Sequence, residues 1–177
     1  MVKSPEPWLR GSLPGILPSL QPVGHALVGA GEDVHAAAGA LTAAQLWLQP
    51  GGAASVGFHL LHLSGSTDRL FTYARGEVLS DAQRRGLAAE RALPEPPPSL
   101  ESVLAAWHET VHQALDQLAQ TTDAMLSEIR PVGRAQLPST VRGLLFHAAE
   151  HAQRHTGQVI TTTRIIRGLG PGPGGTV

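Results

Sequence analysis

Apolar residues recur at steps of three and four over several long stretches, which is the spacing of one face of an α-helix. The clearest stripe lies within residues 100–129, at Val103, Leu104, Trp107, Val111, Leu115, Leu118, Thr122 and Met125. The alternation of apolar and polar positions that is typical of a half-buried strand does not extend over a useful length. The pattern therefore predicts an all-α protein.

Four long helices are predicted from these stripes and from the residues that start and stop helices. Serine and threonine caps, proline in a first turn and glycine just past a last turn give the ends. The expected spans are 21–41, 53–74, 100–129 and 139–167, with a short helical turn after Thr42. Long helices that each carry one apolar stripe favour a four-helix bundle.

A long connection, residues 77–100, separates the second and third predicted helices. Its first part is expected to hold a short helix after Ser80, and its second part, PEPPP, to be stiff and extended. Residues 1–20 are predicted to be an irregular lead-in, and the glycine- and proline-rich residues 169–177 a disordered tail. A length of 177 residues suggests one domain, so residues 1–168 are expected to form a single helical unit.

Composition narrows the range of functions. The formal net charge is −1, which gives no general attraction for nucleic acid or an anionic membrane. No apolar run approaches the ~18 residues of a membrane span, and proline and glycine interrupt the N-terminal stretch where a signal peptide would need an apolar core. We therefore expect a cytoplasmic protein. Cysteine is absent, which excludes disulfides, cysteine-ligated zinc and a protein thiol nucleophile.

Histidine is the residue type that points to chemistry. The segment FHAAEHAQRHTGQV places His147, His151 and His155 four residues apart, within a sector of roughly 80° on a helix. His151 and His155 lie on the stripe that should face the bundle interior. A buried ring nitrogen without a partner costs about 1–3 kcal/mol, and a shared divalent ion would satisfy both rings. The alternative is an ordinary pair of core histidines bonded to the backbone or to each other.

The second predicted helix offers a third ligand. His59 aligns with its more apolar line, and His62 lies about 60° away, so periodicity does not choose between them. Gly65 and Ser66 are small and are expected to leave room for an open site beside His62.

Other polar residues are expected to lie outside such a site. His108 and His112 have the same four-residue spacing, but they flank the apolar stripe of their helix and are predicted to be solvated. Glu150 points about 100° away from His151 and is expected at the surface or behind a ligand. No carboxylate on an inward face stands out as a general base.

Two segments resemble the DinB/YfiT-like superfamily. His151, His155, Gly157 and Gln158 form a His-x-x-x-His-x-Gly-Gln ending that is similar to its last helix, and HLLHLSGS resembles its first ligand segment. The resemblance extends from about Leu20 to Gly168. It implies an up-down-down-up bundle with a long connection after the second helix, in agreement with the spans above.

The resemblance also implies a metal held by three histidines. Carried over to this sequence these are His62, His151 and His155, with His59 and His147 as reserve candidates. The chain departs from the pattern at Thr156, where many relatives have arginine or histidine, so a contact to an anionic substrate is in doubt there.

Three neutral imidazoles would leave the ion its charge and an open position, and they suit zinc or nickel. The resemblance implies transfer of a low-molecular-weight thiol, such as bacillithiol, mycothiol or glutathione, to an electrophile in detoxification or stress response. The expected partners are therefore a small-molecule thiol and an electrophile, and the resemblance suggests a homodimer. Two alternatives stay open: a non-catalytic metal- or small-ligand-binding stress protein, and a metal-assisted hydrolase.

Overall fold

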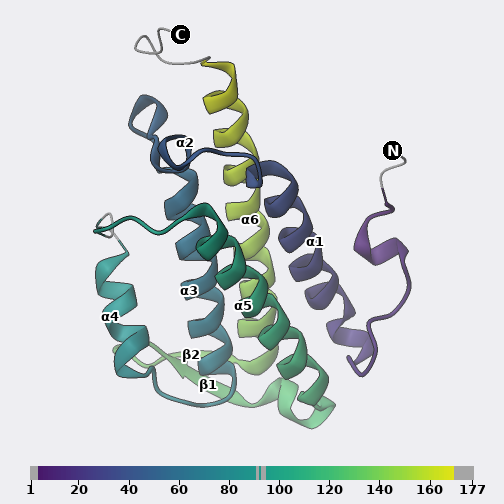
Figure 1. Cartoon of the computed structure of the whole chain (residues 1–177). Coiled ribbons are helices and arrows are strands. Elements are labelled where there is room, and N and C mark those ends of the chain that lie inside the picture. Colours follow the sequence, from purple (N-terminus) through teal and green to yellow (C-terminus); the bar gives the residue numbers. More distant parts are fainter. Residues whose placement is uncertain (1–3, 91, 93–94, 170–177) are drawn as a thin grey trace, which may run out of the picture.

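The computed structural model describes residues 4–90, 92 and 95–169, and within them the chain is mostly helical (Figure 1). This confirms the helical prediction. The predicted disordered tail lies almost wholly outside the described residues, so that prediction stays open. The α-helices are α1 (Gln21–Ala38), α2 (Ala43–Trp47), α3 (Val56–Ala74), α4 (Asp81–Ala89), α5 (Leu100–Gln120) and α6 (Val141–Gly168). Short 3₁₀ turns are at Pro7–Leu9, Pro18–Leu20, Pro50–Gly52 and Asp123–Ser127.

Helices α1, α3, α5 and α6 pack side by side around one core. Figure 1 shows α1 and α6 running in one direction and α3 and α5 in the other. Helix α6 lies against both α1 and α3, and α3 also packs on α5. Because α3 and α6 are neighbours along their length, side chains on their facing stripes can meet.

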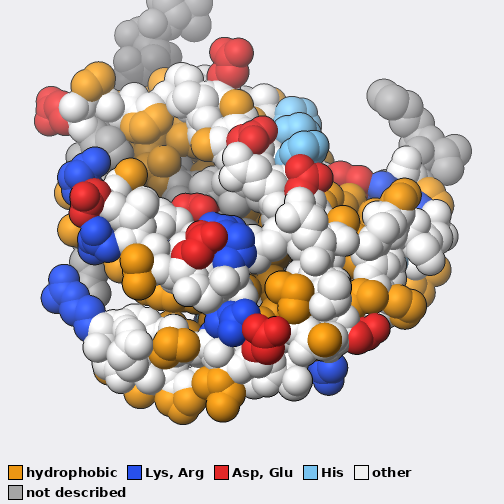
Figure 2. Space-filling view, turned by 90° about the horizontal axis from the view of Figure 1, so that it is seen from below, with side chains coloured by type: hydrophobic (Ala, Val, Ile, Leu, Met, Phe, Trp, Pro, Cys, Tyr) orange, Lys and Arg blue, Asp and Glu red, His pale blue; other side chains and the backbone are white. Residues whose placement is uncertain are grey.

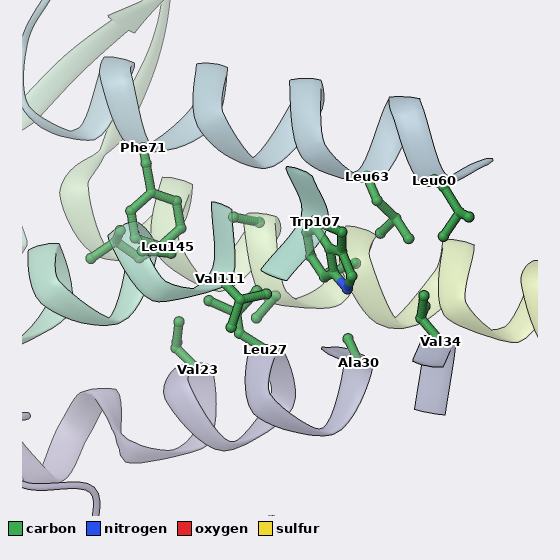
Figure 3. Packing of buried hydrophobic residues seen from close by; sticks show 14 of the residues in the cluster. Val23, Leu27, Ala30, Val34, Leu60, Leu63, Phe71, Trp107, Val111 and Leu145 are labelled. Carbon is green, nitrogen blue, oxygen red and sulfur yellow. The ribbon is translucent and has the colours of Figure 1, made fainter. Parts of the chain in front are cut away.

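The core is aliphatic and centred on one tryptophan. Trp107 of α5 is only 1% exposed and lies among side chains of α1 and α3, such as Ala30 and Leu63 (Figure 3). Leu27 of α1 and Leu145 of α6 are fully buried in the same cluster. Burial of a leucine side chain contributes about 1.5–3 kcal/mol, so this cluster holds the helices in place around the site described below.

Hydroxyl caps set the starts of the helices that carry the histidines. The side chain of Ser55 accepts a hydrogen bond from the Phe58 N–H at 3.1 Å at the start of α3. Thr140 does the same for the Gly143 N–H at 3.0 Å at the start of α6. Such caps satisfy donors that a helix leaves free in its first turn and are worth about 1 kcal/mol.

The predicted C-terminal end of the third helix, at residue 129, was wrong. Helix α5 stops at Gln120, because Thr121 takes extended backbone angles (φ −80°, ψ 126°) and its N–H bonds back to the Leu118 carbonyl. The next apolar residues belong to a 3₁₀ turn, in which Leu126 is 1% exposed. Apolar spacing alone therefore carried the prediction past a break in the backbone. The first helix is also shorter than predicted, since α1 ends at Ala38.

A small hairpin joins α5 to α6, so the expectation of no strands was also wrong. Strands β1 (Ile129–Val132) and β2 (Leu137–Thr140) pair antiparallel, with Pro131 opposite Pro138. Gly133 takes a positive φ of 67° in the turn between them. Four-residue strands that each contain a proline are too short to show alternation in a sequence.

The predicted short helix in the long connection is confirmed as α4. Ser80 and Gln83 form a capping box at its start, in which each side chain bonds the other's backbone N–H. No residue of α4 is buried. Instead, the Gln83 side-chain amide donates to Asp68 Oδ2 at 2.8 Å and to Thr72 Oγ1 at 2.7 Å, which ties α4 to α3.

Figure 2 shows acidic, basic and apolar side chains intermixed over the face seen from below. Among the helices that the structure describes, none has both the length and the apolar character that crossing a membrane requires.

Candidate metal centre

Three histidine rings from two helices meet on the α3–α6 seam. His62 of α3 and His151 and His155 of α6 each offer one ring nitrogen, and these atoms all lie within 4.8 Å of one another. The ring centroids are 5.1 Å apart for His62 and His151, 4.6 Å for His62 and His155, and 4.5 Å for the α6 pair. All three side chains are partly buried, so the group is held by the fold and still reachable from solvent.

The hydrogen bonds of His62 show which of its nitrogens faces the group. Its Nδ1 lies 3.0 Å from Oε2 of Glu90, and its Nε2 lies 2.9 Å from Nε2 of His151. A carboxylate only accepts, so Nδ1 of His62 carries the proton. Nε2 is therefore the nitrogen of His62 that faces the other rings, and it is the atom that this ring can offer to a metal ion.

His59 lies behind the group rather than in it. The residue is only 5% exposed, and its Nδ1 is 3.0 Å from Nδ1 of His155. That contact leaves Nε2 of His155 free. Of the two α3 histidines that periodicity could not separate, the structure therefore brings His62 to the α6 pair and places His59 as a partner of His155.

His147 lies at the surface. It lies one turn before His151, with ring centroids 5.6 Å apart, but its Nδ1 is 3.4 Å from Oε2 of Glu150. Glu150 also pairs with Arg154, and that hydrogen bond holds the pKa of the Glu150 carboxyl below its usual range. His147 thus belongs to an exposed charge cluster beside the three rings.

Burial disfavours the protonated form of the two α6 rings and of His59. Burial, together with the neighbouring imidazoles, lowers the pKa of His155 to about 4. Burial is also the main cause that lowers the pKa values of His151 and His59. Desolvation disfavours the charged imidazolium, and metal ligation requires the neutral ring, so the same burial that keeps protons off keeps the lone pairs available.

The donor set fits a divalent metal ion. Neutral imidazole is a preferred ligand of zinc, copper and nickel, and three protein ligands leave a position for another molecule. Nδ1 of His151 is buried without a hydrogen-bond partner among the described residues, so the protein itself does not fully satisfy this cluster. The fold thus brings together three histidines that can hold a metal ion.

A family comparison agrees with this arrangement. The model of the DinB superfamily matches residues 26–159, which is most of the chain. The chain belongs to the DinB superfamily. The matched range contains all of α3, the connection and the part of α6 that carries the histidines. None of the curated proteins compared with it matches this DinB-superfamily chain.

Two sequence expectations for the surroundings need correction or refinement. The room predicted beside Gly65 is filled by the side chains of Arg69 and Glu90, so it is not open space. Thr156, where many DinB relatives were expected to have a charged residue, is 2% exposed. That position faces the core, so it offers no contact to a substrate.

The second histidine pair stays apart, as predicted. His108 and His112 on α5 are exposed, and Nδ1 of His112 lies 3.5 Å from Oδ2 of Asp116 in the next turn. They border a groove of about 530 Å³ between α1 and α5.

Sequence reasoning missed Glu90 and its partner Arg69. Glu90 follows α4 in the long connection and is 28 residues from His62, so no local spacing links the two. The only available signal was the capping box at Ser80, which predicts where α4 begins and hence where its C-terminal end lies.

Proposed function

We propose that this DinB-superfamily protein is a metal-dependent transferase that adds a low-molecular-weight thiol to electrophiles. The site is built on an up-down-down-up four-helix bundle, with His62, His151 and His155 as the metal ligands. The observation that carries the proposal is the convergence of these three rings from α3 and α6.

The chemistry of the donor set supports thiol transfer. When bound by three neutral ligands, a divalent ion keeps its full charge and lowers the pKa of a coordinated thiol, which supplies a thiolate nucleophile at neutral pH. The chain has no cysteine, so the thiol has to come with a co-substrate. Bacillithiol, mycothiol and glutathione are the candidate classes.

The protein's own residues hold and shield the ligands. Phe58 stacks parallel to the His62 ring, with centroids 5.7 Å apart and planes inclined by 6°. This packing keeps water from one face of that ring. Glu90 and His59 bond the far nitrogens of His62 and His155, so both rings are held with Nε2 toward the centre.

The carboxylates near the rings favour thiol transfer over hydrolysis. A metal-assisted hydrolase needs a general base within reach of the attacking water. Glu90 is hydrogen-bonded to His62 and forms an ion pair with Arg69, and Glu150 pairs with His147 and Arg154. Each of these carboxylates already has two partners, which supports a reaction whose nucleophile is a bound thiol.

The finer attributes follow from the same proposal. Zinc or nickel is the metal that suits three imidazoles. A homodimer and a role in detoxification or stress response are the expected setting.

The decisive experiment measures metal content and conjugation together. Protein purified without an affinity tag is loaded with zinc or nickel and supplied with each thiol and monochlorobimane. Conjugation above the level of a His62→Ala variant, with His108→Ala behaving as wild type, is expected. Metal bound at His62 without conjugation of any thiol would mean a non-catalytic binding protein, and failure to bind either metal would overturn the proposal.

A further inference from the structure

We infer that Glu90 is a positioning residue for His62, so that the long α3–α5 connection forms part of the metal site. The inference rests on the proposed role of His62 as a ligand. None of the histidines of the site belongs to α4. The inference is that α4 positions one carboxylate, that of Glu90, beside His62.

The contacts place this carboxylate between two α3 side chains. Oε2 of Glu90 lies 3.0 Å from Nδ1 of His62, and Oε1 lies 2.5 Å from Nη2 of Arg69. The Glu90 and Arg69 side chains are only 15% and 10% exposed. Because both side chains are screened from solvent, their charges attract each other more strongly than those of an exposed surface salt bridge.

The geometry fixes the orientation of the His62 ring. Because Glu90 accepts a hydrogen bond from the Nδ1–H of His62, only Nε2 of His62 is left to face His151 and His155. A ligand that is held in this way loses less side-chain freedom when an ion binds.

Gly65 makes room for the carboxylate on the surface of α3. A Cβ at this position would lie 2.8 Å from Nη1 of Arg69 and 3.1 Å from Oε1 of Glu90. A glycine inside a helix is destabilising relative to alanine. Here the missing side chain lets Glu90 and Arg69 lie against the helix one turn from His62.

Helix α4 reaches this position through polar contacts. Its start is held by the Ser80 capping box, and Gln83 bonds Asp68 and Thr72 of α3. Glu90 follows directly after the last turn of α4. The placement of the carboxylate therefore depends on how α4 docks on α3, not on the hydrophobic core.

The first test measures zinc affinity by competition with a chelator. We expect Glu90→Ala to weaken zinc binding about 10–100-fold, the usual effect of removing a partner of a ligating histidine. Gly65→Ala should weaken it in the same direction by crowding Glu90 and Arg69. The matched controls are Glu95→Gln, an exposed carboxylate of the same connection, and Gly86→Ala, where a Cβ meets nothing within 4 Å. Both controls should stay within about twofold of wild type, and thermal melting should show that all variants fold.

The second test needs no metal. Ring-nitrogen NMR of the metal-free protein should show His62 protonated on Nδ1 in wild type and mixed between both nitrogens in Glu90→Ala. If wild type binds no zinc but His62 shows this Glu90-dependent proton, the proposed function fails and the positioning role stands. If zinc binding is lost in His62→Ala but unchanged in Glu90→Ala and Gly65→Ala, the positioning role is overturned and the metal site stands. An unchanged His62 ring in Glu90→Ala would overturn it as well.

Discussion

Two histidine pairs with the same spacing have different surroundings in this protein. His151 and His155 on α6 face α3 and meet His62 within 4.8 Å. His108 and His112 on α5 border the α1–α5 groove and are exposed. A four-residue spacing brings two rings onto one face of a helix, but only a second helix carrying its own imidazole turns that face into a site.

The difference lies in how the helices pack. Helix α6 packs closely on α3 along the stretch that carries His59 and His62. Across the α1–α5 groove, His35 is the only histidine that α1 contributes to the described lining, and it makes no three-residue metal group with the α5 pair. Burial follows the same division, since it lowers the pKa values of His151 and His155.

The largest expected effect separates the two pairs directly. Replacing His62, His151 or His155 by alanine removes one of the three proposed ligands and should weaken zinc binding by more than the roughly 100-fold expected for an outer partner. His108→Ala and His112→Ala should leave affinity unchanged. Isothermal titration of the five variants tests this, and a comparable loss in an α5 variant would show that the comparison is wrong.

A smaller effect is expected for the partner behind the ligands. His59→Ala removes the group that orients His155 but none of the three converging nitrogens, so zinc affinity should fall about 10–100-fold. The same titration distinguishes whether His59 orients His155 or is itself a ligand. A loss as complete as that of His62→Ala would make His59 a ligand.

The smallest effect concerns pH and the metal-free protein. The pKa of His155 is about 4 in the folded chain and about 6.5 when unfolded, so between these values the unfolded state binds the extra proton. Stability of the metal-free protein should therefore fall as the pH drops from about 6.5 to 4. His155→Gln should lose part of this dependence, and His108→Gln should keep it. Thermal melting in the presence of a chelator, at about pH 7.5 and pH 5, measures how much stability each protein loses at the lower pH. If His155 is not shielded from protonation, wild type and His155→Gln should lose the same amount.

Much of the fold was predictable because it is local. The apolar stripe of α5 and the caps at Ser99 and Thr140 depend on residues a few positions apart, and the structure has helices there. The end of α5 was not predictable from the stripe, since Met125 continues its spacing but lies in a 3₁₀ turn after the backbone break at Thr121.

The residues of the site likewise fall into those that local spacing could predict and those that depend on the packing of separate helices. The α6 pair could be predicted from spacing, because one helix fixes the relation of His151 to His155. The choice between His59 and His62 could not, since it depends on how α3 is rotated against α6. The role of Glu90 was further out of reach, because it comes from contacts between α4 and α3 that no periodicity encodes.

The lack of any buried side chain in α4 has a consequence for how the protein behaves over time. Segments that bury few apolar side chains open locally at less free-energy cost than the core. Helix α4 can therefore undock from α3 while the hydrophobic core stays folded. Each undocking leaves the His62 ring free to rotate. The lifetime of a bound ion would then follow the undocking rate of this arm instead of the rate at which the whole chain unfolds.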